Sequence, residues 1–349
     1  MSIVSLCRAC CLAGVFGLLG ASSSAVSAAP PLTFDASPYL QPARLVDIGG
    51  RRLNLYCTGE GSPTIILEAG LGDDLTTWRY VQPALARRTR VCAYDRAGMG
   101  FSEGAAPPRD ALAVTEDLHV LLQHAEVSPP YILVGSSLGG LYALLFTERF
   151  RQEVAGLVLV DPSELSETEF QFVAPAFTAS SASWRQQSAS CLETVQRHPL
   201  TPGSGEYDLC VPAAKAIAQY CKTDTPQCTL AKMKAGHRAG LDYLTDFVSE
   251  QQSWGARTSE ELRANAKALG SLPVTVLTGA KTFTDLPDIP EDQKIAAENL
   301  WIKMHEGQAS LSSRGRHMLV ADSGHVIQFD APDAVTSAIE SILDQLRTP

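Results

Sequence analysis

Residues 131–139 read YILVGSSLG. The apolar run Tyr131–Val134 has the composition of a buried strand, and a helix-like run extends from Leu138 to Phe150. Between them lies a short turn that carries two serines flanked by glycines. A strand, a sharp turn with a serine and a helix together form the context that a nucleophile elbow requires. The stretch therefore predicts a reactive serine at the end of a strand.

The two serines of this turn are distinguished by their neighbours. Because the turn is strained, the positions two before and two after the nucleophile need to be nearly free of side chains. Ser137 has Gly135 and Gly139 at these positions, whereas Ser136 has Val134 and Leu138. The pattern therefore favours Ser137 as the nucleophile.

Short apolar runs alternate with helical patterns on both sides of this turn, which predicts an α/β fold with a mostly parallel sheet flanked by helices. A hairpin is expected around Gly49-Gly50, and a helix from Trp78 to Ala86. The runs expected to form strands are Thr64–Leu67, Val91–Tyr94, Tyr131–Val134, Gly156–Val160, Pro273–Thr278 and Met318–Ala321. We assign residues 44–162 and 271–349 to this core.

The alternation stops between residues 163 and 270. This segment has helical patterns without convincing strands and is interrupted by prolines and glycines near residue 200. We interpret it as a helical cap inserted into the core.

The N-terminus has the pattern of an export signal. Arg8 precedes an uncharged apolar stretch that ends in small residues, which predicts a signal peptide over residues 1–28, cut after Ala28. An uncleaved anchor is less favoured, because serines break the apolar run before it is long enough to span a bilayer. Residues 29–43 are expected to form an extended segment on the surface. The mature chain would be secreted or periplasmic, without integral association with a membrane.

Charge and cysteine content are consistent with an exported protein that does not bind nucleic acid. Removal of residues 1–28 takes away one basic residue and no acid, so the net charge changes from −10 to −11, which disfavours nucleic acid as a partner. Six of the nine cysteines remain, an even number that is consistent with disulfides after export. We expect the pairs Cys57–Cys92, Cys191–Cys210 and Cys221–Cys228. Their spacing does not match a zinc site.

A serine nucleophile needs a base, and His325 is the best candidate among the seven histidines. It lies in the loop Asp322–His325, between the last predicted strand and the last helix, which is expected from about Pro332 to Leu346. Loops at the carboxyl ends of parallel strands are where such sheets present reactive groups. We therefore expect His325 to face Ser137.

With these motifs in their order, the chain resembles the α/β-hydrolase fold superfamily. The resemblance rests on the elbow, on the loop Asp95–Ser102, which reads DRAGMGFS, and on Ser323-Gly324-His325 near the end of the chain. It extends from about Arg44 to the C-terminus and is interrupted by the cap. It implies a nucleophile, an acid and a histidine in this order along the chain.

The resemblance leaves the identity of the acid open. Relatives most often carry it about three residues after a glycine that ends the strand beyond the cap, but here Gly279 is followed at that distance by Thr282. Other members carry it at the end of the strand before the cap, which is Asp161 in this chain. We favour Asp161 over Asp285, with Asp288 third.

The resemblance also implies an oxyanion hole formed by two backbone N–H groups, those of Leu71 and Leu138. In the Asp95–Ser102 loop, Asp95 and Arg96 are expected to tie loops together rather than to react.

Together these features predict a serine hydrolase that acts on a small-molecule acyl substrate, with a carboxylic ester favoured, and that needs no metal or organic cofactor. An aminopeptidase of the same fold is the nearest enzymatic alternative, and it would need an acidic group in the cap to bind a free amine. A non-catalytic binding protein on a hydrolase scaffold is the alternative from another class.

Overall fold

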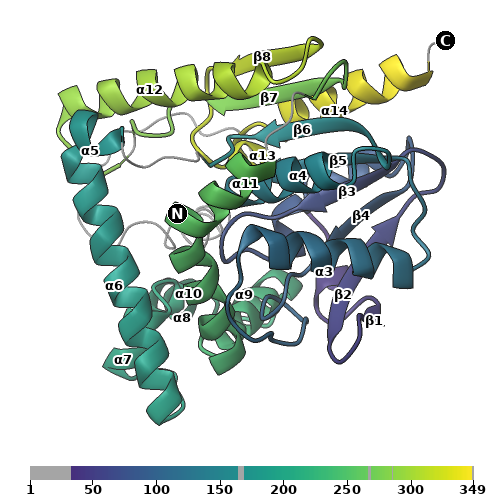
Figure 1. Cartoon of the computed structure of the whole chain (residues 1–349). Helices are drawn as coiled ribbons and strands as arrows, with labels where there is room; N and C mark the ends of the chain where they lie inside the picture. Colours follow the sequence, from purple (N-terminus) through teal and green to yellow (C-terminus); the bar gives the residue numbers. More distant parts are fainter. Residues whose placement is uncertain (1–32, 164–168, 266–268, 285, 348–349) are drawn as a thin grey trace.

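Eight strands form one sheet in the part of the chain that the structure, a computed structural model, describes: residues 33–163, 169–265, 269–284 and 286–347. The predicted signal peptide lies outside these residues. The strands are β1 (Leu45–Asp47), β2 (Arg52–Thr58), β3 (Thr64–Glu68), β4 (Val91–Tyr94), β5 (Tyr131–Ser136), β6 (Val154–Val160), β7 (Val274–Gly279) and β8 (Gly315–Val320). Their order across the sheet is β1-β2-β4-β3-β5-β6-β7-β8 (Figure 1).

The sheet is parallel from β4 to β8, and only β1 and β2 run antiparallel to their neighbours. The hairpin expected around Gly49-Gly50 is present, with the Ile48 N–H donating to the Arg51 carbonyl at 2.9 Å. Because parallel strands all end at the same edge, the loops after β3, β5, β6, β7 and β8 lie together. This edge carries every sequence-predicted site residue that the structure describes.

Helices cover both faces of the sheet. The helical elements of the core are η1 (Ser37–Tyr39), η2 (Leu75–Trp78), α2 (Gln82–Leu85), α3 (Ala111–His124), α4 (Leu138–Arg149), α12 (Glu291–Ala309), α13 (Ile327–Asp330) and α14 (Pro332–Arg347). Side chains alternate along the strands: Leu133 packs with α3 and α4, while Ile132 and Val134 pack with α2 and α14. The predicted strands and the predicted final helix are therefore present with small changes in their ends.

The helix predicted from Trp78 to Ala86 is wrong in its extent. The chain forms the 3-10 helix η2, which ends at Trp78, and then the four-residue helix α2. Asp74 caps η2 by accepting a hydrogen bond from the Thr76 N–H at 3.0 Å. Pro83 lies in the first turn of α2, where its missing N–H costs no hydrogen bond, so the apolar spacing there belongs to two short elements.

Between β6 and β7 the described residues form helices and no strand. These are α5 (Phe170–Val173), α6 (Pro175–Arg197), α7 (Gly205–Cys210), α8 (Ala214–Tyr220), α9 (Pro226–Arg238), α10 (Leu241–Ser253), the π-helical turn η3 (Trp254–Thr258) and α11 (Ser259–Asn265). We call this segment the insertion. Figure 1 shows the long helix α6 standing away from the sheet, with α7 and α8 at its far end and α10 beside the core.

Buried charge pairs join the insertion to the core. Arg96, in the loop after β4, pairs with Glu68 and with Glu250 of α10, and each N–O distance is 2.8 Å. The same guanidinium donates to the carbonyls of Ala69 and Gly70 at 2.6 and 2.7 Å. Arg96 therefore ties loops together, as the sequence predicted.

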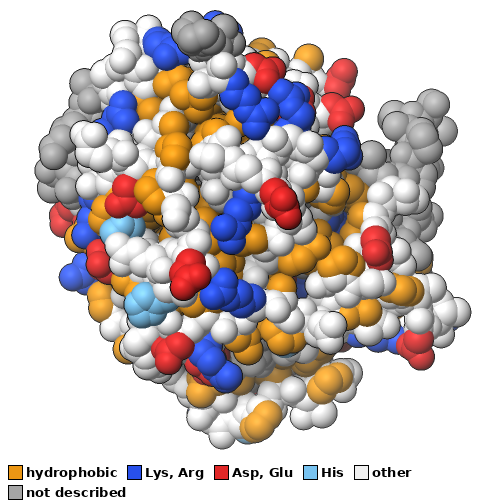
Figure 2. All heavy atoms as spheres, turned by 90° about the vertical axis from the view of Figure 1, so that its right-hand side faces the viewer, with side chains coloured by type: hydrophobic (Ala, Val, Ile, Leu, Met, Phe, Trp, Pro, Cys, Tyr) orange, Lys and Arg blue, Asp and Glu red, His pale blue; other side chains and the backbone are white. Residues whose placement is uncertain are grey.

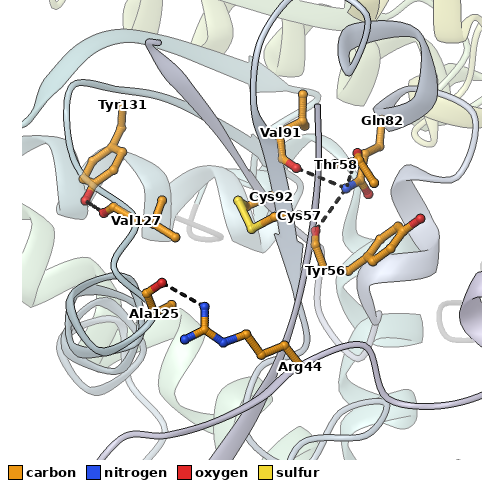
Figure 3. Close-up of a disulfide and its surroundings, with 10 residues drawn as sticks. All are labelled: Arg44, Tyr56, Cys57, Thr58, Gln82, Val91, Cys92, Ala125, Val127 and Tyr131. Carbon is orange, nitrogen blue, oxygen red and sulfur yellow. Dashed lines mark hydrogen bonds between the residues drawn. A yellow bond between two sulfur atoms is a disulfide. The ribbon is translucent and has the colours of Figure 1, made fainter. Parts of the chain in front are cut away.

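All three predicted cysteine pairings are confirmed as disulfides: Cys57–Cys92, Cys191–Cys210 and Cys221–Cys228. The first joins directly opposite positions of the antiparallel strands β2 and β4 (Figure 3). Beside it, the Gln82 side chain donates to the Tyr56 carbonyl at 3.0 Å, which fastens α2 to the same strand. The other two disulfides lie within the insertion.

The surface drawn in Figure 2 carries acidic and basic side chains interspersed with apolar ones. None of the helices in the described ranges combines the length and the apolar character that crossing a bilayer requires.

Candidate active site

Three loops at the carboxyl edge of the sheet bring together residues that are far apart in the sequence. Ser137 follows β5, Asp161 follows β6 directly, and His325 lies in the loop between β8 and α13. Ser137 and His325 are 188 positions apart in sequence, yet their side chains are in hydrogen-bond contact.

The turn at Ser137 has the strained geometry that the sequence predicted. Ser137 directly precedes α4 and has a φ of 54°, a backbone conformation that residues other than glycine rarely adopt. A Cβ at Gly135 would lie 2.2 Å from the Gly139 carbonyl oxygen, and a Cβ at Gly139 would lie 2.3 Å from the Ala69 carbonyl oxygen. Both distances are too short for any side chain, so the two glycines are required by close backbone contacts.

The neighbouring serine has a different role. Ser136 is the last residue of β5, is almost fully buried, and its hydroxyl accepts a hydrogen bond from the Gln328 side chain at 3.0 Å. It therefore fastens α13 to the sheet, while the Ser137 hydroxyl faces His325.

The His325 imidazole lies between a hydroxyl and a carboxylate. Its Nε2 is 3.0 Å from Ser137 Oγ, and its Nδ1 is 2.6 Å from Asp161 Oδ2. Because an ionised carboxylate can only accept, Nδ1 carries the hydrogen and Nε2 is left to accept from the serine hydroxyl. This is the tautomer that a general base for Ser137 requires.

Asp161 is fully buried and has a φ of 44°, a conformation that is unfavourable for a residue with a side chain. Its Oδ1 accepts from the Gly279 N–H at 2.9 Å and from the Trp301 indole N–H at 3.1 Å. Its Oδ2 accepts from the Thr282 hydroxyl at 2.9 Å as well as from His325. Four donors compensate for the removal of this carboxylate from water.

The pKa of His325 is raised above its ordinary value. Burial alone would lower it, but the hydrogen bond from Nδ1 to Asp161 and the negative charges of Asp161 and Asp73 favour the imidazolium more strongly. The site therefore stabilises the charged state that a base reaches after it has taken a proton.

Close contact between two loops sets the position of His325. A Cβ at Gly279 would lie 2.2 Å from the Gly324 carbonyl oxygen, so the end of β7 touches the His325 loop backbone to backbone. The Lys281 N–H donates to the Ser323 carbonyl at 3.0 Å, and the Gly324 N–H donates to Asp330 at 3.0 Å. These contacts hold the histidine loop against the end of β7.

The two residues expected to supply oxyanion donors, Leu71 and Leu138, each adjoin a residue at or close to Ser137. Leu138 is the first residue of α4, where a backbone N–H has no acceptor within the helix. Leu71 follows Gly70, and a Cβ built at Gly70 would lie 3.3 Å from the Ser137 Cβ. The loop after β3 therefore lies against the serine.

The remaining acid candidates are placed differently. Asp285 lies outside the described residues. Asp288 is exposed, and its φ is 63°. Of the candidates that the structure describes, Asp161 is the one in contact with His325.

Sequence reasoning did not identify the side chains that surround Asp161. Thr282 occupies the position where the resemblance implied an acid, and it donates to the acid instead. Trp301 and His305 lie on α12, far from Asp161 in the sequence, so neither spacing nor local pattern connects them to it. Buried Ser163, with its Oγ 3.5 Å from Ser137 Oγ, was likewise not singled out. No cluster of metal-ligating side chains occurs within the described ranges.

Comparisons with known proteins agree with this fold. The family model described as alpha/beta hydrolase fold matches residues 63–196. The uncharacterized protein YqjL of Bacillus subtilis is 24% identical over 284 residues, covering 81% of this chain and 85% of its own length. An AB hydrolase superfamily protein of Gibberella zeae is 23% identical over 321 residues, covering 82% and 87% respectively.

Among solved structures, a thermophilic esterase from Thermogutta terrifontis superposes with a TM-score of 0.60 at 20% identity, over 88% of this chain and 100% of the esterase. The family model and these similarities, together with the sheet order and the elbow, show that the chain has the alpha/beta hydrolase fold and confirm its resemblance to the α/β-hydrolase fold superfamily.

Proposed function

We propose that this protein is a serine hydrolase that cleaves a carboxylic ester through an acyl-enzyme intermediate. The observation that carries the proposal is the unbroken hydrogen-bond chain from Ser137 through His325 to Asp161. A hydroxyl is a poor nucleophile at neutral pH, and this arrangement is the one that activates it.

The residues take the following roles in the proposed reaction. As Ser137 Oγ attacks the acyl carbon, its proton passes to His325 Nε2, and Asp161 stabilises the resulting imidazolium. The imidazolium then gives the proton to the leaving alcohol oxygen as the bond between that oxygen and the acyl carbon breaks. Water then attacks the acyl carbon while one of its protons passes to His325, and the imidazolium returns this proton to Ser137 Oγ as the acyl–serine bond breaks, which releases the acid and restores the serine.

The negative oxygen of each tetrahedral intermediate would be held by the N–H groups of Leu71 and Leu138. The position of Leu138 at a helix N-terminus supports this role, because the helix dipole favours negative charge there. The contact of Gly70 with Ser137 supports the same role for the loop that contains Leu71.

The insertion is proposed to act as a cap that shapes the substrate pocket. Leu71 packs against a buried cluster that includes Phe247 of α10, and Tyr243 of α10 and Trp184 of α6 pack against the same cluster. Gly72 supports this close contact, because a Cβ there would lie 2.8 Å from the Phe247 ring. An apolar aromatic wall next to the oxyanion loop favours substrates with an apolar acyl or alcohol group.

Export of the protein belongs to the same proposal. Every cysteine within the described residues is paired in a disulfide, and disulfides persist in oxidising compartments. Together with the N-terminal pattern of residues 1–28, this supports a secreted or periplasmic protein.

Labelling with a fluorophosphonate, followed by peptide mapping, tests the proposal. We expect the adduct on Ser137, its loss in S137A, and its retention in the matched control S136A. A folded wild-type protein that is not labelled would instead be a binding protein on this scaffold. Rates on p-nitrophenyl esters compared with aminoacyl p-nitroanilides then separate an esterase from an aminopeptidase.

A further inference from the structure

One face of α12 contacts three consecutive residues at the end of β6. Trp301, His305 and Gln308 are spaced by four and three positions, so their side chains lie on the same side of the helix. The Trp301 indole N–H donates to Asp161 Oδ1 at 3.1 Å, and His305 Nε2 lies 2.8 Å from the Pro162 carbonyl oxygen. The Gln308 amide donates to the Ser163 carbonyl at 3.3 Å.

The segment that these side chains contact is one that would not keep its conformation by itself. Asp161 has a φ of 44°, and a residue in this region persists only when its surroundings hold it there. The next residue, Pro162, has no N–H with which to stabilise the turn. Contacts from outside are therefore needed to fix the direction of the Asp161 side chain.

The hydrogen on His305 is fixed by a second chain of contacts. Its Nε2 faces a carbonyl and must donate, so Nδ1 is left as the acceptor for the Thr278 hydroxyl at 2.6 Å. The Thr278 oxygen in turn accepts from His317 Nε2 at 2.7 Å. This network accommodates a neutral His305 with its hydrogen on Nε2.

The charges around His305 are consistent with this state. Burial lowers the pKa of His305 to about 4, and the neighbouring His317 and His325 act in the same direction, although Asp161 and the contact to Pro162 oppose them. His305 therefore keeps the same form throughout the pH range in which His325 would titrate.

Trp301 links this network to the site. Its ring lies against His305, with centroids 4.7 Å apart, and 6.4 Å from the His325 ring. The indole thus donates to Asp161 and has the rings of both His305 and His325 as neighbours.

We propose that Trp301 and His305 are positioning residues, which hold the Asp161 turn so that its carboxylate stays directed at His325. This inference rests on the proposed function, because it assigns the two residues a role in the same reaction. Loss of either contact is expected to lower kcat about 10- to 100-fold with KM changed less than about threefold, since small displacements of a catalytic group have effects of this size.

Two matched pairs of variants test the proposal. H305Q keeps an N–H at the place of Nε2, whereas H305N places its amide nearer the position of Nδ1, out of reach of the Pro162 carbonyl. W301F removes the indole donor, and W78F makes the same change at a fully buried tryptophan whose indole N–H has no partner among the described residues. We expect low kcat in H305N and W301F and near wild-type kcat in H305Q and W78F.

The pH profile of kcat/KM separates positioning from a general structural defect. If Asp161 turns away, His325 loses the interactions that raise its pKa, so the acidic limb moves to lower pH by about 0.5 unit or more. A defect that only reduces the active fraction lowers the profile without moving it.

These experiments distinguish failure of this inference from failure of the proposed function. A wild-type protein that neither hydrolyses esters nor reacts with a fluorophosphonate overturns that function and this inference together. An active wild type with unchanged kcat in H305N and W301F overturns this inference alone. A lower kcat in H305N and W301F without a shift in the acidic limb of the kcat/KM profile also overturns this inference alone.

Discussion

The Thr282 hydroxyl lies 2.9 Å from Asp161 Oδ2, the same oxygen that His325 Nδ1 contacts at 2.6 Å. Thr282 stands three residues after Gly279, where the resemblance implied an acid, and Asp161 stands at the end of the preceding strand. Positions 161 and 282 are therefore adjacent in the fold, although they follow different strands. An acid placed on either strand end could face the same imidazole.

This relationship predicts that the acid can be moved. D161N is expected to lower kcat/KM on an ester by about four orders of magnitude, because the imidazole loses its orienting carboxylate. In D161N/T282D, a carboxylate at position 282 would restore a negative charge beside His325, and we expect 10-fold or greater recovery over D161N. Steady-state kinetics of the purified variants check this.

The control for charge is D161N/T282N, which has the same size as the rescued variant and no carboxylate. Recovery in both double variants would show that polarity alone is sufficient. Lack of recovery in a folded D161N/T282D would contradict the shared position inferred here.

The raised pKa of His325 predicts the pH dependence of activity. The base must be neutral, so kcat/KM for an uncharged ester should rise with pH through an apparent pKa above 6.5. In D161N the charge of Asp161 and its hydrogen bond as a carboxylate are lost, while burial and the charge of Asp73 remain, so the rise should move to lower pH than in the wild type. A profile of D161N that coincides with that of wild type would contradict this.

The raised pKa of His325 also makes the stability of the folded state depend on pH. A histidine whose pKa is raised by folding stabilises the folded state fully below its unfolded pKa of about 6.5. This contribution is lost as the pH rises through the folded value. H325Q should therefore flatten the dependence of the free energy of unfolding on pH as the pH rises above about 6.5, measured by urea denaturation.

The sequence was sufficient for those features that depend on local sterics. Two glycines around Ser137 predicted the elbow, and the structure gives the reason, since a side chain at Gly139 would collide with a backbone oxygen. It could not show which acid is used or what surrounds it. Asp161 and Trp301 are 140 positions apart, and they meet only because β6 and α12 pack in the folded chain.

The helix predicted from Trp78 to Ala86 shows a second limit of prediction from sequence. Apolar spacing from Trp78 to Ala86 suits one helix, but the 3-10 helix capped by Asp74 ends at Trp78, and α2, with Pro83 in its first turn, begins at Gln82. The spacing of apolar residues reports which side chains are buried, and it does not report where the backbone hydrogen bonds begin and end.

Close contact of the elbow with the loop after β3 predicts a strong effect at Gly139. G139A would place a Cβ 2.3 Å from the Ala69 carbonyl oxygen, and we expect a loss of about 1–3 kcal/mol in the free energy of unfolding together with loss of labelling at Ser137. Gly236, an exposed position within α9, has open space around it. G236A should be neutral or stabilising by up to about 1 kcal/mol, and equal destabilisation by both changes would contradict the steric argument.

The three disulfides should stabilise the fold in the order of the chain lengths that they close. Their sequence separations are 35 for Cys57–Cys92, 19 for Cys191–Cys210 and 7 for Cys221–Cys228. Longer closed loops remove more entropy from the unfolded chain, which gives about 4, about 3 and about 2 kcal/mol respectively. Guanidinium unfolding of the three double alanine variants measures this order.

Because the disulfides lie in different parts of the fold, their removal should affect stability and activity differently. Cys57–Cys92 joins β2 and β4, outside the loops that carry Ser137, Asp161 and His325, so C57A/C92A should lower the unfolding midpoint most and still be labelled at Ser137 while folded. Cys191–Cys210 joins α6 to α7, and α6 carries Trp184 of the proposed pocket wall. C191A/C210A should therefore raise KM for apolar esters despite its smaller cost in stability. The reverse pattern, a large KM change in C57A/C92A with none in C191A/C210A, would show that the insertion does not shape the pocket.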